Sequence, residues 1–217
     1  MGYNGVNMLR IACPGRAVPS AGKCSHAFSP SKPEHPMAVS LFAAEFFEDG
    51  FLTAPLAVNN WEPGTHLELY GPLGRGFQLP SHVQRLALAG IGEPGYRLLP
   101  IILQALKKDA AVVLFIEGES PSLPTAVEVH PLDLLPDAYG WADFLAIEAS
   151  IGAIASLRNR LGIMSNAVNL LCPAQVLVVS PMPCGGVADC GVCCVKTQRS
   201  WKMVCKHGPV FALELLI

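Results

Sequence analysis

The sequence is poor in charge, and the charges that it has nearly cancel. Charged residues make up 15% of the 217 residues, and the formal net charge is -2 at pH 7. This balance gives no electrostatic attraction to nucleic acid or to an anionic membrane surface. No apolar run approaches the roughly 20 residues that cross a bilayer. The N-terminus also lacks the basic start and apolar block of a signal peptide, so we expect a cytoplasmic protein that binds neither nucleic acid nor membrane.

Aromatic residues are scarce at 7%, but 51% of the residues are apolar, which indicates buried cores and not disorder. The cysteines are unevenly distributed. Five of the eight cysteines fall in the stretch MPCGGVADCGVCCVKTQRSWKMVCKHG near the C-terminus. Because cytosolic thiols stay reduced, clustered cysteines in that compartment bind metal more often than they form disulfides.

The chain has two regions that differ in their residue pattern. Residues 1 to about 80 are rich in Pro and Gly, with short apolar segments between turn signals, which predicts a small antiparallel β unit. The connector GPLGRGFQLP follows, and after it buried apolar runs alternate with segments of helical spacing, which predicts a parallel α/β sheet. The strands are expected in 83–90, 110–118, 125–132 and 174–181, the helices in 96–108 and 151–162, and 141–150 fits a strand or a short helix.

A glycine-rich turn follows the first strand of the α/β region. In LALAGIGEPGYRLL, Gly90, Gly92 and Gly95 have G-x-G-x-x-G spacing between a predicted strand and a predicted helix, as in dinucleotide-binding turns. Glycines there admit a pyrophosphate close to the backbone, and the helix N-terminus supplies N–H groups. Pro94 suits the first helical turn, and Glu117 could accept a hydrogen bond from a ribose hydroxyl. An ordinary tight βα turn is the alternative.

The C-terminal cysteines have metal-ligand spacing. Cys184, Cys190, Cys193 and Cys205 give C-x5-C-x2-C-x11-C, and the side chain of the adjacent Cys194 should point away. Three cysteines on one loop and a distant fourth favour a plant-type [2Fe–2S] site, because structural zinc usually uses two C-x2-C pairs. Small residues in the loop let backbone N–H groups turn toward bridging sulfides. A zinc site and free core thiols are the alternatives.

These residues also carry a resemblance. MPCGGVADCGVCCVKT and WKMVCKHGPVF resemble the C-terminal iron–sulfur segment of the electron-transfer subunit of type B dihydroorotate dehydrogenase, in the ferredoxin reductase superfamily. The likeness runs from GPLGRGFQLP through AGIGEPGYRLLP and WADFLAIE to the end. The sequence departs from the family in the first cysteine spacing, which is x5 where the family commonly has x4, and in a shorter loop before the fourth cysteine.

The resemblance implies a flavin site that is incomplete here. In the family an Arg-x-Tyr/Phe-Ser motif binds the flavin, and its Arg pairs with phosphate. The nearest match is HAFS, in which His26 replaces the Arg and Phe28 and Ser29 follow; a second stretch, GFLTAPL, offers Gly50 and Thr53. An imidazole with a pKa near 6.5 is mostly neutral at pH 7. The region also falls about one strand pair short of a six-stranded barrel.

The expected organisation has three parts. Residues 1–77 form a shortened N-terminal antiparallel β-barrel of flavin type, 78–180 a parallel α/β nucleotide-binding domain, and 181–217 a C-terminal [2Fe–2S] lobe. The resemblance implies an electron-transfer subunit of an oxidoreductase, and no side chain is given a catalytic role. Electrons would pass from NAD(P)H, by way of FAD if it is bound, to a [2Fe–2S] cluster.

The resemblance also implies a partner. The cluster would exchange electrons with a catalytic flavoprotein subunit such as dihydroorotate dehydrogenase, in a hetero-oligomer that serves pyrimidine biosynthesis. A flavin is the usual converter between hydride transfer and single electrons, so without it the chain would be a relay or docking subunit. The alternatives are the same module in a hydrogenase- or sulfide-linked oxidoreductase, and a non-catalytic zinc-bearing interaction protein.

Overall fold

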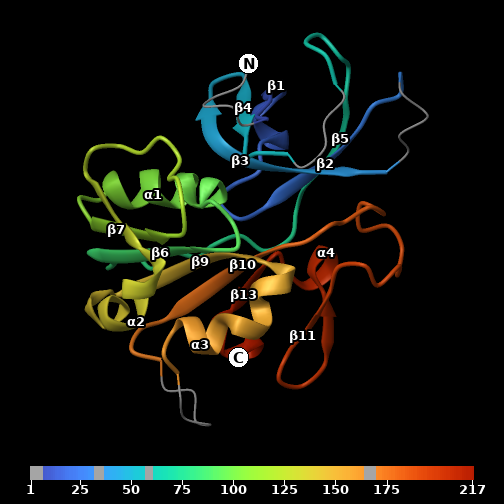
Figure 1. Ribbon diagram of the computed structural model, residues 1–217. Helices are drawn as coiled ribbons and strands as arrows, with labels where there is room; N and C mark the ends of the chain where they lie inside the picture. Colours follow the sequence, from blue (N-terminus) through green and yellow to red (C-terminus); the bar gives the residue numbers. More distant parts are fainter. Residues whose placement is uncertain (1–6, 32–36, 57–60, 164–169) are drawn as a thin grey trace.

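A computed structural model describes residues 7–31, 37–56, 61–163 and 170–217. The molecule has two main sheets, one antiparallel and one mostly parallel, with the C-terminal segment beside them (Figure 1). Within the described residues, no helix is long and apolar enough to span a bilayer.

The N-terminal sheet is antiparallel and curled. Within the described residues it has five strands in the order β1-β4-β3-β2-β5. The strands are β1 (Arg10–Ala12), β2 (Cys24–Phe28), β3 (Val39–Phe47), β4 (Gly50–Thr53) and β5 (Glu68–Leu73). A register shift between Ala43 and Glu45 bends β3, because an extra residue in one strand increases its local twist. Within the part of the chain that the structure describes, the result is a half-barrel of five strands, where the full barrel of the resembled family has six.

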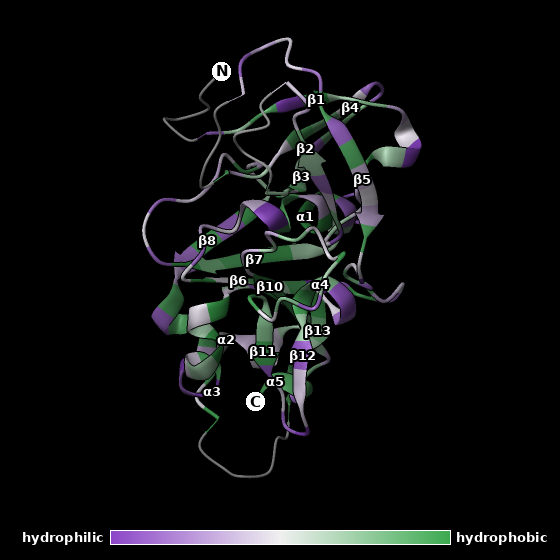
Figure 2. Cartoon of the chain, turned by 90° about the vertical axis from the view of Figure 1, so that its right-hand side faces the viewer, coloured by the Kyte–Doolittle hydropathy of each residue, from purple (hydrophilic) through white to green (hydrophobic). Residues whose placement is uncertain are grey.

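The second sheet has the parallel α/β architecture predicted from the sequence. Its order in the described residues is β13-β10-β9-β6-β7-β8, and β13 alone runs antiparallel to its neighbour. The strands are β6 (Arg85–Ile91), β7 (Ala111–Ile116), β8 (Val127–Pro131), β9 (Phe144–Ser150), β10 (Ala174–Val179) and β13 (Val210–Ala212). Continuous apolar runs such as RLALAGI form strands covered on both faces, and Figure 2 shows the central strands largely in hydrophobic green.

Short helices cover the parallel sheet, and one 3-10 helix, η1, lies against β5 of the N-terminal sheet. The α-helices are α1 (Leu99–Leu106), α2 (Leu135–Ala138), α3 (Leu157–Arg160), α4 (Val204–His207) and α5 (Leu213–Leu216), and the 3-10 helices are η1 (Gly15–Ala17), η2 (Tyr96–Leu98), η3 (Leu132–Leu134), η4 (Tyr139–Trp141) and η5 (Ile151–Ser156). Helix α1 packs between the two sheets, and α2 and α3 lie on the opposite face (Figure 1). The helix predicted at 151–162 is mostly 3-10, ending in one α-helical turn.

The C-terminal segment does not stand apart from the α/β sheet. Its cysteine loop leads into a hairpin of β11 (Cys194–Lys196) and β12 (Trp201–Met203). The chain then returns through α4 to the large sheet, where β13 pairs with β10. The connector after β5 also meets this return, because Arg75 N donates to Gly208 O at 2.6 Å. The boundary at residue 180/181 therefore stays a prediction.

One hydrophobic core spans the two sheets and the C-terminal segment. It contains Phe42 and Ala44 of the N-terminal sheet, Ile147 and Leu177 of the parallel sheet, and Val204 of α4. All five side chains are buried. The space between the sheets is therefore filled by side chains over much of its area.

Candidate iron–sulfur centre and glycine-rich turn

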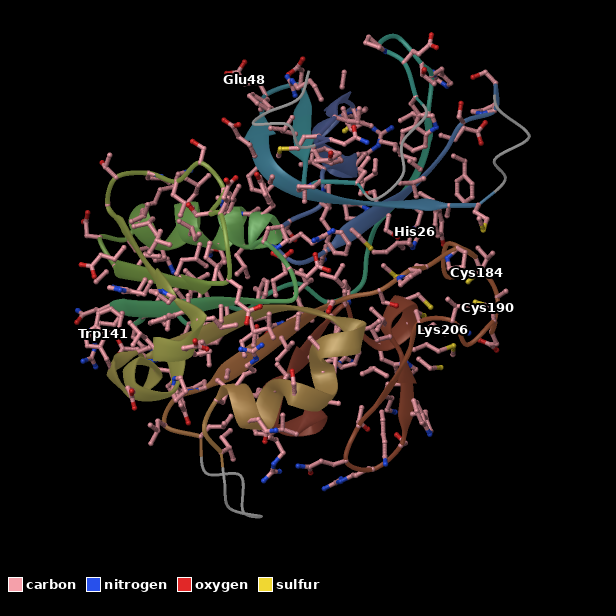
Figure 3. All side chains as sticks on the ribbon, viewed as in Figure 1. His26, Glu48, Trp141, Cys184, Cys190 and Lys206 are labelled. Carbon is pink, nitrogen blue, oxygen red and sulfur yellow. The ribbon has the colours of Figure 1, made fainter. Side chains whose placement is uncertain are left out.

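The structure brings the four predicted cluster cysteines together as two pairs. The Sγ atoms of Cys184 and Cys190 lie 3.6 Å apart, and those of Cys193 and Cys205 lie 3.4 Å apart. Figure 3 shows Cys184 and Cys190 at the edge of the molecule, with Lys206 close by. Within the described residues, no group of three or more His, Cys, Asp or Glu side chains is arranged to hold a single metal ion.

Backbone hydrogen bonds fix the loop that carries these thiols. Gly185 N donates to Met182 O at 2.9 Å, and Cys194 N donates to Gly191 O at 3.0 Å. Gly185 has φ +59°, and a side chain there would meet Phe28 and Ala38 at 3.2 Å. Glycine is therefore needed at this position both for its backbone conformation and for the close contact with the N-terminal sheet.

The thiols influence one another electrostatically. Burial, followed by the neighbouring thiol of Cys193, raises the pKa of Cys205 to about 12. Backbone hydrogen bonds with Ala188 and Gly186 lower the pKa of Cys184. A bound metal centre reverses the first effect, because metal coordination deprotonates a thiol outright.

The donor set fits an iron–sulfur cluster. Four cysteine thiolates are the usual ligands of a [2Fe–2S] cluster, and two thiolates on one tetrahedral metal lie nearly 4 Å apart when each metal–sulfur bond is about 2.3 Å. The two sulfur pairs therefore suit two iron atoms with two thiolates each. Cys194 begins β11, where its Cα faces Met203 of β12.

The glycine-rich turn lies where the sequence predicted it, at the carboxyl end of β6. Gly92 and Gly95 have φ values of +67° and +85°, which only glycine adopts at little cost. A Cβ on Gly92 would lie 2.8 Å from the Ser150 hydroxyl, and one on Gly90 would lie 2.4 Å from Glu93 O. The chain's own atoms thus already require glycine at two of the three positions.

A buried ion pair sits directly against this turn. Arg97 in η2 donates its backbone N–H to Glu148 Oε2 at 2.9 Å and its Nη1 to Glu148 Oε1 at 2.6 Å. The same Nη1 lies 3.0 Å from Glu93 Oε2. Glu148 is 0% exposed. Burial alone would lower the pKa of Arg97, but the carboxylates of Glu148 and Glu93 raise it overall, so the guanidinium stays charged.

The N-terminal sheet covers this ion pair. Arg97 Nη2 donates to Pro55 O at 3.5 Å, and the guanidinium lies 5.4 Å from the ring centroid of Phe42. Within the described residues, Arg97 Nε is the buried side-chain donor without a hydrogen-bond partner. The pair therefore joins the two sheets at the turn.

Two predicted nucleotide residues have other roles in the structure. Glu117, just after β7, forms an ion pair with Arg160 of α3, with Oε1 and Nη2 2.8 Å apart. Pro94 lies in the turn before η2, so its predicted place in the first helical turn was wrong; Pro100 occupies that position in α1. Gly95 has a left-handed backbone conformation, so the helical conformation begins only after it, at Tyr96.

The predicted flavin residues are engaged within the protein. Thr53 Oγ1 accepts a hydrogen bond from Leu9 N at 2.9 Å, and a side chain on Gly50 would collide with Ile11 O. Ser29 Oγ lies 3.0 Å from Ser31 Oγ. His26 is 1% exposed and its Nδ1 lies 3.1 Å from Ser40 Oγ.

His26 and Phe28 face the cysteine loop and not an open cleft. Burial lowers the pKa of His26, so its imidazole is neutral at pH 7. A Cβ on Gly185 would lie 3.2 Å from Phe28 and 3.8 Å from His26. The position that carries the phosphate-binding Arg in the resembled family is therefore uncharged and in contact with the cysteine loop.

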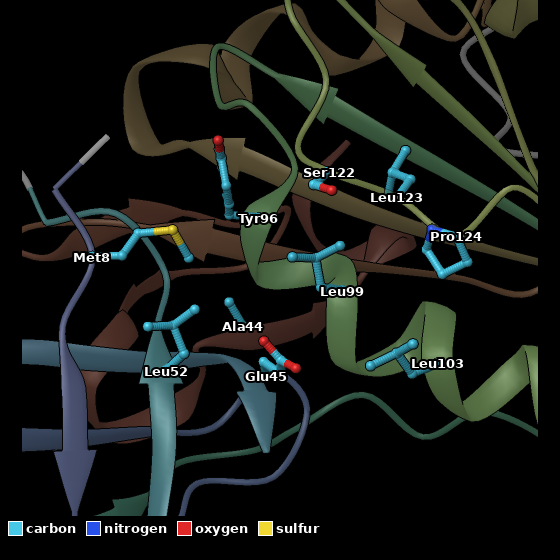
Figure 4. Close-up of a pocket in the computed structure, with 10 residues that line it drawn as sticks. All are labelled: Met8, Ala44, Glu45, Leu52, Tyr96, Leu99, Leu103, Ser122, Leu123 and Pro124. Atoms are coloured by element: carbon cyan, nitrogen blue, oxygen red, sulfur yellow. The ribbon is translucent and has the colours of Figure 1, made fainter. Parts of the chain in front are cut away.

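A pocket of about 320 Å³ opens between α1 and the N-terminal sheet (Figure 4). Apolar side chains dominate its lining, with Glu45, Ser122 and Tyr96 as polar members. None of the ten described residues that line it is a cation. The pocket therefore offers a phosphate group no counter-charge.

Comparison with known proteins supports the reading of the cysteines. Residues 180–217 match the model of the iron–sulfur cluster binding domain of dihydroorotate dehydrogenase B. The resemblance seen in the sequence is confirmed for this segment. The segment is therefore similar to an iron–sulfur cluster binding domain. A search of curated proteins found no match.

Solved structures show the same fold. The chain resembles the NADH-dependent reduced ferredoxin-NADP oxidoreductase, with a TM-score of 0.67 and 17% identity over 97% of this chain and 87% of the other. It also resembles the ferredoxin reductase in carbazole 1,9a-dioxygenase, with a TM-score of 0.50 and 17% identity over 71% of this chain and 57% of the other. The fold is therefore that of a ferredoxin reductase, as predicted.

Sequence reasoning missed the Arg97–Glu148 pair. Its sequence signal was present: FLAIEAS carries a glutamate inside an otherwise apolar run, in a strand that reads as buried. A buried carboxylate is rare unless it is paired. The sequence therefore indicated that Glu148 has a basic partner. It did not indicate which one, because Arg97 lies 51 residues earlier in the chain.

Proposed function

We propose that this chain is the electron-transfer subunit of an oxidoreductase and that Cys184, Cys190, Cys193 and Cys205 hold one [2Fe–2S] cluster. The observation that carries the proposal is the arrangement of the four thiols in two pairs, in a segment that matches an iron–sulfur domain. A bound cluster of this kind accepts and releases one electron at a time.

The chain's own residues shape the surroundings of the thiols. The exposed Cys190 and Val187 lie at the loop surface, where Val187 is 79% exposed. Cys193 is buried beside Val195 and Val204 in the main core. Cys190 thus faces solvent, Cys193 faces the protein interior, and Cys184 and Cys205 are half-buried, so the four thiols extend from the surface to a sheltered site.

A catalytic flavoprotein subunit of the dihydroorotate dehydrogenase type is the proposed partner, in a hetero-oligomer. The description of the matched domain supports this choice. NAD(P)H is the proposed source of electrons for the complex as a whole. Residues 1–77 would serve as a docking and covering sheet, 78–180 as the central scaffold, and 181–217 as the redox segment.

A visible spectrum of anaerobically purified protein, with iron, sulfide and zinc analysis, tests the proposal. We expect charge-transfer absorption and about two irons and two sulfides per chain. One zinc per chain with no iron would contradict it and would favour the zinc-bearing interaction protein.

A further inference from the structure

The crevice in which an open α/β sheet binds its ligand is identifiable from the strand order. From β6 the chain proceeds to β7 and β8 on one side, and β9 returns on the other side of β6. Ligands bind outside the carboxyl ends of the strands where the order reverses, here between β6 and β9. Gly90 of β6 is the Cα partner of Glu148 of β9, so Glu148 stands at that point.

Glu148 takes hydrogen bonds from one residue, Arg97, that a phosphate at this turn would use. A dinucleotide pyrophosphate binds to backbone N–H groups at the start of the helix after the glycine-rich turn. Here the Arg97 N–H donates to Glu148 Oε2 at 2.9 Å. The guanidinium, the natural counter-ion for a phosphate, is bound to Glu148 and Glu93.

The local charge and packing also oppose a nucleotide. Two carboxylates face one guanidinium, and the N-terminal sheet closes over them through Pro55 and Phe42. Arg97 Nε is a further N–H of this guanidinium, and it is buried. A dinucleotide would have to displace an internal anion and open the packed sheets.

The flavin residues are unsuited to their expected ligand for the same kind of reason. Thr53 and Ser29 hydrogen-bond within the chain, and Gly50 packs on Ile11. His26 is buried against Ser40, where the resembled family has an Arg. The cysteine loop contacts Phe28 through Gly185. No cation among these residues faces a phosphate.

We propose that this chain binds neither a dinucleotide nor a flavin, and that its cluster receives single electrons from a protein and not from NAD(P)H. This inference rests on the proposed function. The donor is a reduced iron–sulfur or flavin protein that loses one electron, and the acceptor gains one. No hydride or proton moves at this chain, so the nucleotide chemistry of the complex belongs to its partners.

Calorimetry and spectroscopy on the full-length, cluster-loaded chain test the proposal. We expect no saturable binding of NADH, NADPH or FAD at ligand concentrations up to about 1 mM. Dithionite, a one-electron reductant, should bleach the cluster absorption, and NADH should leave it unchanged under anaerobic conditions. Saturable NADH or FAD binding, or bleaching by NADH alone, would overturn the inference.

A variant tests whether Glu148 excludes phosphate groups from the glycine-rich turn. Glu148→Gln keeps the shape and removes the negative charge that binds the Arg97 guanidinium. Inorganic pyrophosphate is much smaller than a dinucleotide and carries its own negative charge, so it should bind measurably to this variant and not to the wild type. The matched control is Glu128→Gln on β8, an exposed carboxylate that should change nothing. Equal absence of binding in both variants would show that Glu148 does not exclude phosphate; if Glu148→Gln fails to fold, the wild-type measurements decide alone.

The two proposals fail in different ways. A preparation without iron and sulfide contradicts the proposed function and leaves the nucleotide question to calorimetry on the same protein. A preparation that holds iron and sulfide and also binds NADH supports the electron-transfer function but contradicts the inference.

Discussion

Two glycine-rich segments of this protein, the cysteine loop and the turn after β6, resemble ligand sites in sequence. Their side chains have different surroundings in the structure. Around the cysteine loop, four thiols gather with sulfur contacts among themselves. At the turn after β6, Glu148 and Arg97 already fill the position. The four thiols contact one another in pairs, whereas the backbone N–H and the guanidinium of Arg97 at the turn are bound to Glu148. A motif predicts a site only where its ligating groups are left free by the rest of the chain.

The largest expected effect concerns the cysteine loop. Replacing any one of Cys184, Cys190, Cys193 and Cys205 with Ser should remove most of the iron, because a hydroxyl is a much poorer iron ligand than a thiolate. The Cys194→Ser variant is the matched control and should keep wild-type iron and sulfide content. Iron and sulfide analysis after anaerobic purification measures both. Loss of iron from Cys194→Ser, or its retention in Cys205→Ser, would show that the four ligands are wrongly assigned.

The next effect concerns the filled turn. Arg97→Met leaves the fully buried Glu148 without its main counter-charge, and we expect a loss of about 3–5 kcal/mol in the free energy of unfolding. Urea denaturation at pH 7 measures it. The double variant Arg97→Met/Glu148→Gln should recover part of the loss, because the unpaired charge is gone.

An exposed pair supplies the control for that experiment. Arg160→Gln breaks the ion pair with Glu117, whose side chains are 40% and 53% exposed, and pairs of this kind contribute about 0.2–1 kcal/mol. If Arg97→Met costs no more than Arg160→Gln, then the buried pair does not hold the turn closed and the contrast between the two turns is lost.

Much of the fold could be predicted, because the composition of its longer strands is typical of buried strands. The runs in β6, β7 and β10 are continuous and apolar, as strands of a doubly covered parallel sheet must be. Strands β1, β11, β12 and β13 have three residues each, and no periodicity can be read from three residues. Their pairing comes from tertiary contacts, so the sequence did not reveal that the C-terminal segment returns to the large sheet.

The candidate site divides in the same way. The cysteine cluster was predictable because ligand identity and spacing are local properties, and all four thiols fall within 22 consecutive residues. The closure of the glycine-rich turn was not, since it depends on Glu148, Arg97 and Pro55 meeting from three distant parts of the chain. Glycine spacing reports a backbone shape, and two of the three glycines are required here by the protein's own atoms.

A smaller effect tests that explanation of the glycines. Gly92→Ala should lower the free energy of unfolding by more than about 1 kcal/mol, because the residue has φ +67° and its Cβ would lie 2.8 Å from Ser150 Oγ. Gly152→Ala is the control, since nothing lies within 4 Å of a Cβ there. Thermal unfolding followed by circular dichroism compares them. Iron content should be unchanged in both, and equal stability of the two variants would mean that Gly92 is not needed for packing.

The smallest effect lies at the opposite end of the same strand pair. Asp143, just before β9, accepts hydrogen bonds from Arg85 Nη2 at 2.7 Å and from the backbone N–H groups of Gln84 and Arg85 at 3.1 and 3.0 Å. It thus uses the same donor types as Glu148, but in contact with solvent. The side-chain hydrogen bond from Arg85, followed by the backbone hydrogen bond from Gln84, lowers the pKa of Asp143.

A carboxylate with a lowered pKa in the folded state stabilises the protein above its unfolded pKa, and that contribution is lost as the pH falls through the folded value. We therefore expect Asp143→Asn to flatten the dependence of stability on pH below about 4, with little change at pH 7 beyond the lost hydrogen bonds. Asp137→Asn on the exposed face of α2 is the control. Urea denaturation at a series of pH values compares the slopes. Identical slopes for wild type and Asp143→Asn would show that this carboxylate is not held in its charged form by the fold. In that case the hydrogen bonds from Arg85 and Gln84 would not be enough to stabilise an exposed carboxylate, whereas those from Arg97 act on a buried one.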